Sequence, residues 1–110
     1  MQLPLQISYR NMESSAAIDT LVREKAAKLE QFHSRIMSCH VAIEQPGRHQ
    51  HQGKQFVVRL DIGVAGSEIA VNRDHHEDAM VAVRDAFDAA RRKLEDHARE
   101  QRGDVKHHEK

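Results

Sequence analysis

Hydrophobic and polar residues alternate in four short stretches of the chain. This is the pattern of a β-strand with one face buried and the other in water. The first stretch covers residues 3–9, the second 36–44, the third 56–62, and a fourth contains Ile69 and Val71. The pattern predicts four strands.

A longer stretch after the first strand repeats its apolar residues at steps of three and four, which predicts an amphipathic helix. This helix spans about residues 15–32, and Ser14 or Ser15 is placed to cap its N-terminus. Its apolar stripe contains Ile18, Leu21, Val22, Leu29 and Phe32.

A second helical pattern spans about residues 75–98. Asp74 followed by Glu77 resembles a capping box at its start. The polar segment 45–53 contains proline and glycine and predicts a hairpin loop. Residues 99–110 show no periodicity, which predicts a disordered polar tail.

The element order is therefore βαβββα, which predicts an α+β fold of one domain over residues 1–98. Each strand has one apolar face and each helix has one apolar stripe, so two layers bury all of them. We expect a four-stranded mixed sheet with both helices packed on one face. The first two strands should be parallel across the helical crossover, and the last three should form an antiparallel meander.

Composition adds several limits. Apolar residues make up 39% and aromatic residues only 4%, so Leu, Ile, Val and Ala should build the core, with Phe32, Phe56 and Phe87 as large anchors. Cys39 is the only cysteine, which excludes a disulfide framework and favours a reducing, cytoplasmic location. The chain shows no apolar run long enough for a membrane span and no signal-peptide pattern at its N-terminus. We therefore expect no membrane partner.

Candidate catalytic and metal chemistry is sparse. The sequence contains no phosphate-binding glycine loop, no GxSxG motif and no HExxH motif. We therefore expect that the protein is not an enzyme and that it binds no cofactor and no small-molecule substrate. The chain contains nine histidines, which are candidate metal ligands. Two pairs, His49/His51 and His107/His108, lie in polar segments, and a pair at 75–76 would diverge at a helix start. Solvated histidines and no metal site are the favoured interpretation.

The informative residues are cations beside the apolar stripes of the helices. Lys25 follows Leu21 by four residues and so lies inside the first stripe, with Lys28 on its flank. The alternative is a snorkelling lysine whose stem packs on the sheet while its charge reaches water.

On the second helix, Arg84 and Arg91 border the stripe, and Arg92 follows. The alternative here is a solvated helix with internal ion pairs such as Asp88 with Arg92. Two such helices side by side would form a basic groove suited to a phosphate backbone. Because the net charge is zero, RNA binding depends on segregated charge, and the scarcity of exposed aromatics favours folded RNA over stacked single strands.

Three segments resemble the family of ribosome hibernation-promoting factors and ribosome-associated translation inhibitors, also called ribosomal subunit interface or sigma-factor modulation proteins. They are ISYRNM at 7–12, KLE at 28–30 and HEDAMVAVRDAFDAARRKL at 76–94. The resemblance is to the short form of the family and covers residues from about 3 to 97.

This resemblance implies the same βαβββα fold and binding to the decoding region of the small ribosomal subunit, where such proteins inactivate or store idle ribosomes during stress or stationary phase. Its partners would be the small subunit and its rRNA. The rRNA-binding residues it implies are Arg10, Lys25, Lys28, Arg84, Arg91 and Arg92. The alternative function is a protein-interaction adaptor that regulates a transcription or stress factor through the solvent-facing side of the sheet or the histidine-rich loop.

Overall fold

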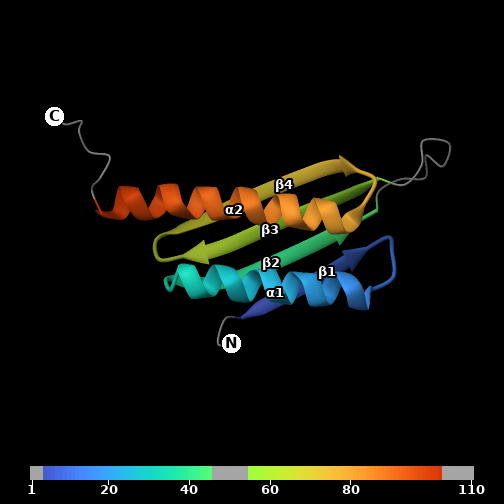
Figure 1. The fold of residues 1–110 in the computed structure, drawn as a ribbon, viewed down its shortest axis with the longest axis horizontal. Helices are drawn as coiled ribbons and strands as arrows, with labels where there is room; N and C mark the ends of the chain where they lie inside the picture. Colours follow the sequence, from blue (N-terminus) through green and yellow to red (C-terminus); the bar gives the residue numbers. More distant parts are fainter. Residues whose placement is uncertain (1–3, 46–54, 103–110) are drawn as a thin grey trace.

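Four strands and two helices follow one another in the predicted order βαβββα (Figure 1). The computed structural model describes residues 4–45 and 55–102. The elements are β1 Leu5–Arg10, α1 Ala16–Phe32, β2 Ile36–Glu44, β3 Phe56–Val64, β4 Ser67–His76 and α2 Ala79–Arg102. The α+β fold class predicted from the sequence is confirmed.

The strands form one sheet in the order β1-β2-β3-β4. β1 pairs with β2 in parallel, because the chain returns through α1 before it enters the second strand. β2, β3 and β4 are antiparallel. The turn between β3 and β4 consists of Ala65 and Gly66, and Gly66 has a φ of 76°, a backbone conformation that glycine adopts without steric cost. The mixed sheet and the meander are confirmed.

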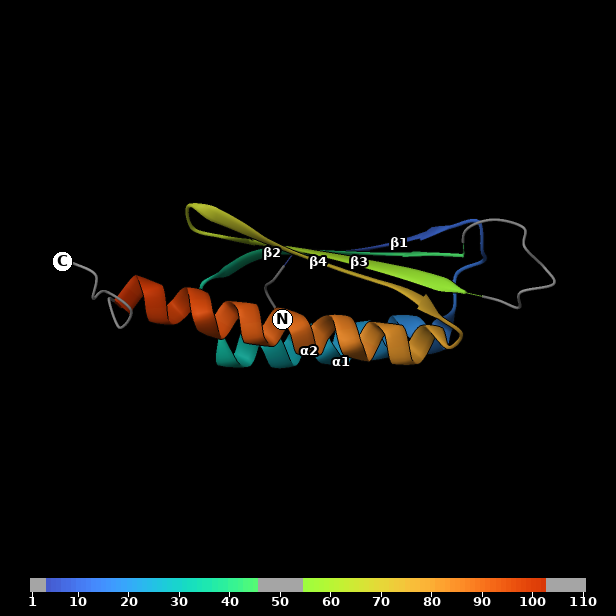
Figure 2. The same cartoon turned by 90° about the horizontal axis from the view of Figure 1, so that it is seen from above.

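Both helices lie on the same face of the sheet and leave the other face uncovered (Figure 2). They lie side by side and run in the same direction, α1 over the β1 and β2 side and α2 over the β3 and β4 side (Figure 1). The N-cap of α1 is Ser15, whose side chain accepts a hydrogen bond from the Ile18 amide at 3.2 Å. The predicted two-layer arrangement is therefore confirmed.

The core lies between the sheet and the helices and is built from aliphatic side chains. Val41, Ile43, Leu60 and Ile62 of the two central strands are fully buried. None of the described residues buries a charged or polar side chain in this core. Phe87 is a core anchor as predicted, at 3% exposure.

The prediction that Phe32 anchors the core is wrong, because this side chain is 70% exposed. Phe32 is the last residue of α1, and Leu29 is the last buried side chain of its stripe. The helical spacing of apolar residues therefore extends to Phe32, but the rest of the protein covers the stripe only as far as Leu29. Phe56 is partly buried and packs against the core.

The predicted start of α2 is also wrong. Residues 75 and 76 belong to β4, which pairs as far as Phe56 with His76, and the helix begins at Ala79. Its N-terminus is capped by Asp78, whose carboxylate accepts a hydrogen bond from the Met80 amide at 2.8 Å. The Asp74 and Glu77 pair only resembles a capping box, since strand pairing holds this segment in the sheet.

The structure describes only parts of the predicted hairpin loop and of the predicted tail. Residue 45 follows β2, and the rest of the predicted hairpin loop, residues 46–53, lies outside the described residues. Residues 99–102 of the predicted tail continue α2. Residues 103–110 lie outside the described residues.

Candidate functional site: the seam between the helices

The orientation of α1 is fixed by a contact with the edge strand β1. The Tyr9 hydroxyl lies 2.9 Å from Asp19 Oδ1 and 3.1 Å from the Ser15 carbonyl oxygen. Burial, and after it the hydrogen bond to Asp19, raise the pKa of Tyr9 above its usual value of 10.0. The flank of α1 that carries Asp19 therefore faces β1, at the outer edge of the sheet.

The opposite flank of α1 faces α2. Helical spacing places Leu21, Lys25 and Lys28 on that flank, because successive members are three or four residues apart. Lys25 is half-buried and Lys28 is exposed. A half-buried lysine within the stripe has its stem partly covered while its ammonium group reaches water, so the snorkelling alternative and a phosphate-binding role are compatible.

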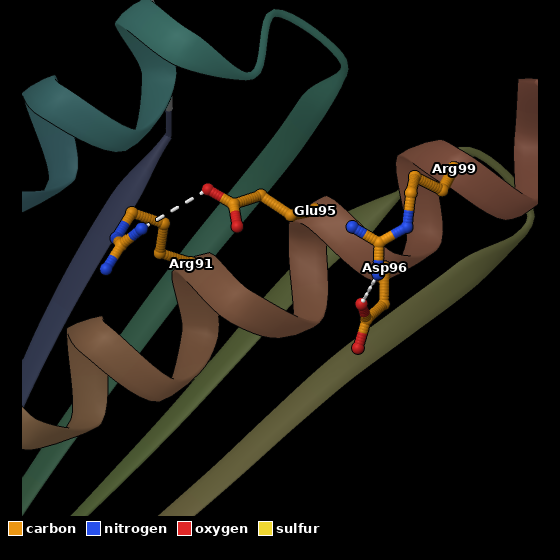
Figure 3. A network of polar contacts seen from close by, with 4 residues as sticks. All are labelled: Arg91, Glu95, Asp96 and Arg99. Carbon is orange, nitrogen blue, oxygen red and sulfur yellow. Dashed lines mark hydrogen bonds and ion pairs between the residues drawn. The ribbon is translucent and has the colours of Figure 1, made fainter.

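A contact on the other side of the molecule shows the orientation of α2, whose apolar stripe is buried against the sheet. Lys93 Nζ donates a hydrogen bond to the Ala70 carbonyl oxygen of the edge strand β4 at 2.9 Å. The flank with Arg84 and Arg91, which are seven residues apart, faces α1. Figure 3 shows Arg91 and Glu95 on the side of α2 nearer α1, with Asp96 on the other side.

We call Lys25, Lys28, Arg84 and Arg91 the helical seam. Arg91 makes an ion pair with Glu95 at 3.3 Å (Figure 3). The other three cations make no ion pair with any described residue. Their positive charge is therefore available to an external anion along the line between the two helices.

Two of the predicted binding residues lie elsewhere. Arg92 is exposed, and by helical spacing it points away from the sheet rather than toward α1. The predicted pair of Arg92 with Asp88 is not formed between these two described residues. Arg10 continues the strand alternation after Tyr9 and so lies on the uncovered face of the sheet, opposite the seam.

The uncovered face of the sheet is polar. We call it the open face. It contains Gln6, Ser8, Arg10, His40, Glu44, Arg59, Asp61 and Asn72. Ser8 Oγ lies 2.9 Å from His40 Nε2, and Arg59 Nε lies 3.3 Å from Asp61 Oδ2. Asp61 pairs with His40 in the strand register but directs its carboxylate to Arg59, so these side chains do not form a catalytic triad.

The histidines and the cysteine contribute no reactive centre in the described part of the chain. No group of three His, Cys, Asp or Glu side chains in residues 4–45 and 55–102 is arranged to hold a metal ion. The pairs His49/His51 and His107/His108 lie outside the described residues. Cys39 is buried, and burial raises its pKa to about 12, so the thiol stays protonated and is a poor nucleophile.

Sequence reasoning missed a pocket at the C-terminal end of the seam. It has a volume of about 270 Å³. Its lining includes Phe32 at the end of α1, His33 and Arg35 of the turn that follows, and Leu94, His97 and Ala98 of α2. The sequence does indicate that Phe32 lies near the seam, because Phe32 follows Lys28 by four residues and so lies on the flank of α1 that faces α2. The prediction that Phe32 anchors the core did not consider it as a surface residue.

Comparisons with known proteins agree with the fold. The structure of a ribosomal subunit interface protein from Coxiella burnetii is similar with a TM-score of 0.74 and 14% sequence identity, over 87% of this chain and 98% of that chain. The N-terminal domain of Protein Y from Thermus thermophilus is similar with a TM-score of 0.70 and 20% identity, over 88% of this chain and 99% of that chain. The curated proteins that were compared with this chain gave no match.

No helix in the described residues is both long and apolar enough to cross a membrane.

The family model described as Sigma 54 modulation protein / S30EA ribosomal protein matches residues 5–102, which include all six elements of the fold. The chain therefore belongs to this family of ribosome-associated translation regulators, which are not enzymes.

Proposed function

We propose that this chain binds the small ribosomal subunit through its helical seam, occupies the region used by mRNA and tRNA, and keeps idle ribosomes inactive during stress or stationary phase. The observation that carries the proposal is the line of cations between α1 and α2. Three of its four members make no ion pair with any described residue. Family membership supports a ribosomal partner.

The seam suits the backbone of folded RNA better than it suits a protein surface. Lys and Arg neutralise phosphates and release condensed counterions, and this gain does not depend on base sequence. The cations come from two parallel helices held on one rigid sheet, so their spacing is fixed before binding. No reaction is required, because a bound chain blocks other ligands by occupying their site.

Sedimentation with purified subunits tests the proposal directly. The chain is mixed with isolated small subunits or large subunits at several potassium chloride concentrations, and the pelleted fraction is measured. We expect binding to small subunits at low salt, with a slope of about −3 in a plot of log affinity against log salt if the four seam cations each contact a phosphate. A failure to pellet with small subunits at low salt contradicts the proposal, and equal binding to large subunits contradicts its specificity.

Competition tests the position of the site. Small subunits loaded with mRNA and initiator tRNA should bind the chain at least about tenfold more weakly than empty subunits, because the ligands exclude one another. Equal affinity for loaded and empty subunits would place the chain outside the decoding region.

A further inference from the structure

The pocket at the end of the seam has an aromatic wall that the fold does not use. Phe32 is 70% exposed, although α1 has a covered stripe and the core is otherwise built from buried apolar side chains. Substitution of an exposed side chain at a helix end costs little stability, so the fold does not require an aromatic ring at this position. An exposed aromatic ring beside a pocket is a feature of binding sites.

The pocket continues the helical seam by one more turn. Phe32 lies four residues after Lys28, and Ala98 lies seven residues after Arg91, so both positions repeat the spacing of the seam cations. A polymer that follows the seam cations toward the C-terminal ends of the helices therefore reaches the pocket next. This continuity connects the occupant of the pocket with the ligand of the seam.

The charge of the pocket favours an anionic partner. Its lining includes the guanidinium of Arg35, which is positive, and the imidazoles of His33 and His97, which can donate hydrogen bonds, and none of its lining residues has a carboxylate. Its floor is apolar and includes Ile36, Val64 and Leu94. A nucleotide matches both features, because its base presents a planar apolar face and polar edges while its phosphate is negative.

The size of the pocket favours a single base. A volume of about 270 Å³ is slightly smaller than most ligand pockets, which suits one ring system rather than a larger ligand. Folded RNA presents single unpaired bases at loops and bulges, and these stack on aromatic side chains. One exposed phenylalanine offers a platform for one such base.

We infer that this pocket receives one unpaired nucleobase of the RNA bound along the helical seam, stacked on Phe32 with Arg35 near its phosphate. The inference rests on the proposed function and adds a second kind of contact to it. The seam cations hold the backbone without regard to sequence, and the Phe32 pocket recognises a place where the RNA is unpaired.

Substitutions at Phe32 separate stacking from simple apolar contact. We expect Phe32→Ala and Phe32→Leu to weaken binding to small subunits about tenfold, because neither side chain stacks, and Phe32→Tyr to bind like the wild type. Met37→Ala is the matched control, since Met37 is also exposed, at 60%, but does not line the pocket. Wild-type affinity in Phe32→Leu contradicts base stacking.

Photocrosslinking identifies the occupant. A chain carrying p-azidophenylalanine at position 32 is bound to small subunits and irradiated, and the crosslinked partner is digested and identified. We expect an rRNA nucleotide that is unpaired in the subunit. A crosslink to a ribosomal protein, or no crosslink from a chain that pellets normally, overturns the inference.

The two proposals fail in different ways. If wild-type chain does not pellet with small subunits, the proposed function fails. If it pellets normally but the Phe32 variants and the crosslink give the negative results above, the proposed function stands and the pocket inference fails.

Discussion

The helical seam and the open face differ in how their charges are used. The open face carries two cations, Arg10 and Arg59, and two carboxylates, Glu44 and Asp61, and Arg59 pairs with Asp61. Along the seam, Lys28 makes no ion pair with any described residue, and the same is true of Lys25 and Arg84. A paired charge is already compensated, whereas an unpaired cation gains most from an external anion.

This difference shows why net charge is a poor guide to the function of this chain. The sum over all 110 residues is zero, which alone argues against RNA binding. Cations and carboxylates are equal in number on the open face, whereas the seam holds four cations, of which Arg91 alone pairs with a carboxylate among the described residues. The adaptor alternative would use the open face or the histidine-rich loop. Experiments that change the seam and spare those surfaces therefore decide between the two functions.

The largest effect is expected from reversal of seam charges. The triple variant Lys28→Glu, Arg84→Glu and Arg91→Glu should bind small subunits at least about 100-fold more weakly, because each phosphate contact becomes a repulsion. All three side chains are exposed, so the fold should remain intact. Fluorescence anisotropy of labelled chain with small subunits measures the affinity, and circular dichroism checks the fold.

A matched triple variant controls for net charge. Arg10→Glu, Arg23→Glu and Arg59→Glu change the charge by the same amount on exposed side chains outside the seam. We expect a loss of less than about tenfold, since exposed charges more than a Debye length from the RNA are screened. Equal losses in the two triple variants would show that the seam has no special role.

A tenfold effect is expected when single arginines on the two faces are compared. Arg84→Gln should weaken binding about tenfold and reduce the salt slope by about 0.8, because one phosphate contact is lost. Arg10→Gln should change the affinity less than about twofold, because Arg10 lies on the open face. The same anisotropy titration at several salt concentrations measures both. A larger loss for Arg10→Gln would move the binding surface to the open face.

The fold was predictable because its periodic segments are long or sharply alternating. The strand from Phe56 alternates without interruption, and the spacing of its inward residues matches the buried positions. The start of α2 was not predictable from local spacing, because Asp74 and Glu77 imitate a capping box while pairing with β3 holds this segment in the sheet. Strand pairing is a long-range interaction, and a local motif does not report it.

The site was predictable only in part. Helical spacing correctly placed Lys25, Lys28, Arg84 and Arg91 beside the apolar stripes, but it did not show which flank of each helix faces the other. That information comes from the contacts of Asp19 and Lys93 with the two edge strands. The prediction that Phe32 is buried was wrong because periodicity shows which side of a helix is apolar. It does not show how far along the helix the sheet and the other helix cover that side.

An effect of about 1 kcal/mol on stability is expected at the contact that orients α1. Tyr9→Phe removes the hydrogen bond to Asp19 and should lower the free energy of unfolding by about that amount, while subunit affinity changes less than about twofold. Because the pKa of Tyr9 is raised in the folded chain, its contribution is complete below pH 10 and is lost as pH rises through the folded-state pKa. Urea unfolding at about pH 8 and about pH 11 should show this decline in the wild type and a smaller one in the variant. An identical decline in both would assign the pH dependence to other groups.

The smallest effect concerns the one seam cation that has a partner. Glu95→Gln removes the carboxylate that pairs with Arg91, so Arg91 becomes available and binding should strengthen about threefold. Asp61→Asn removes the same charge on the open face and releases Arg59, so it is the matched control. If only the seam matters, Asp61→Asn leaves the affinity unchanged. Equal gains in the two variants would show that affinity follows net charge, and a gain only in Asp61→Asn would favour the open face and the adaptor function.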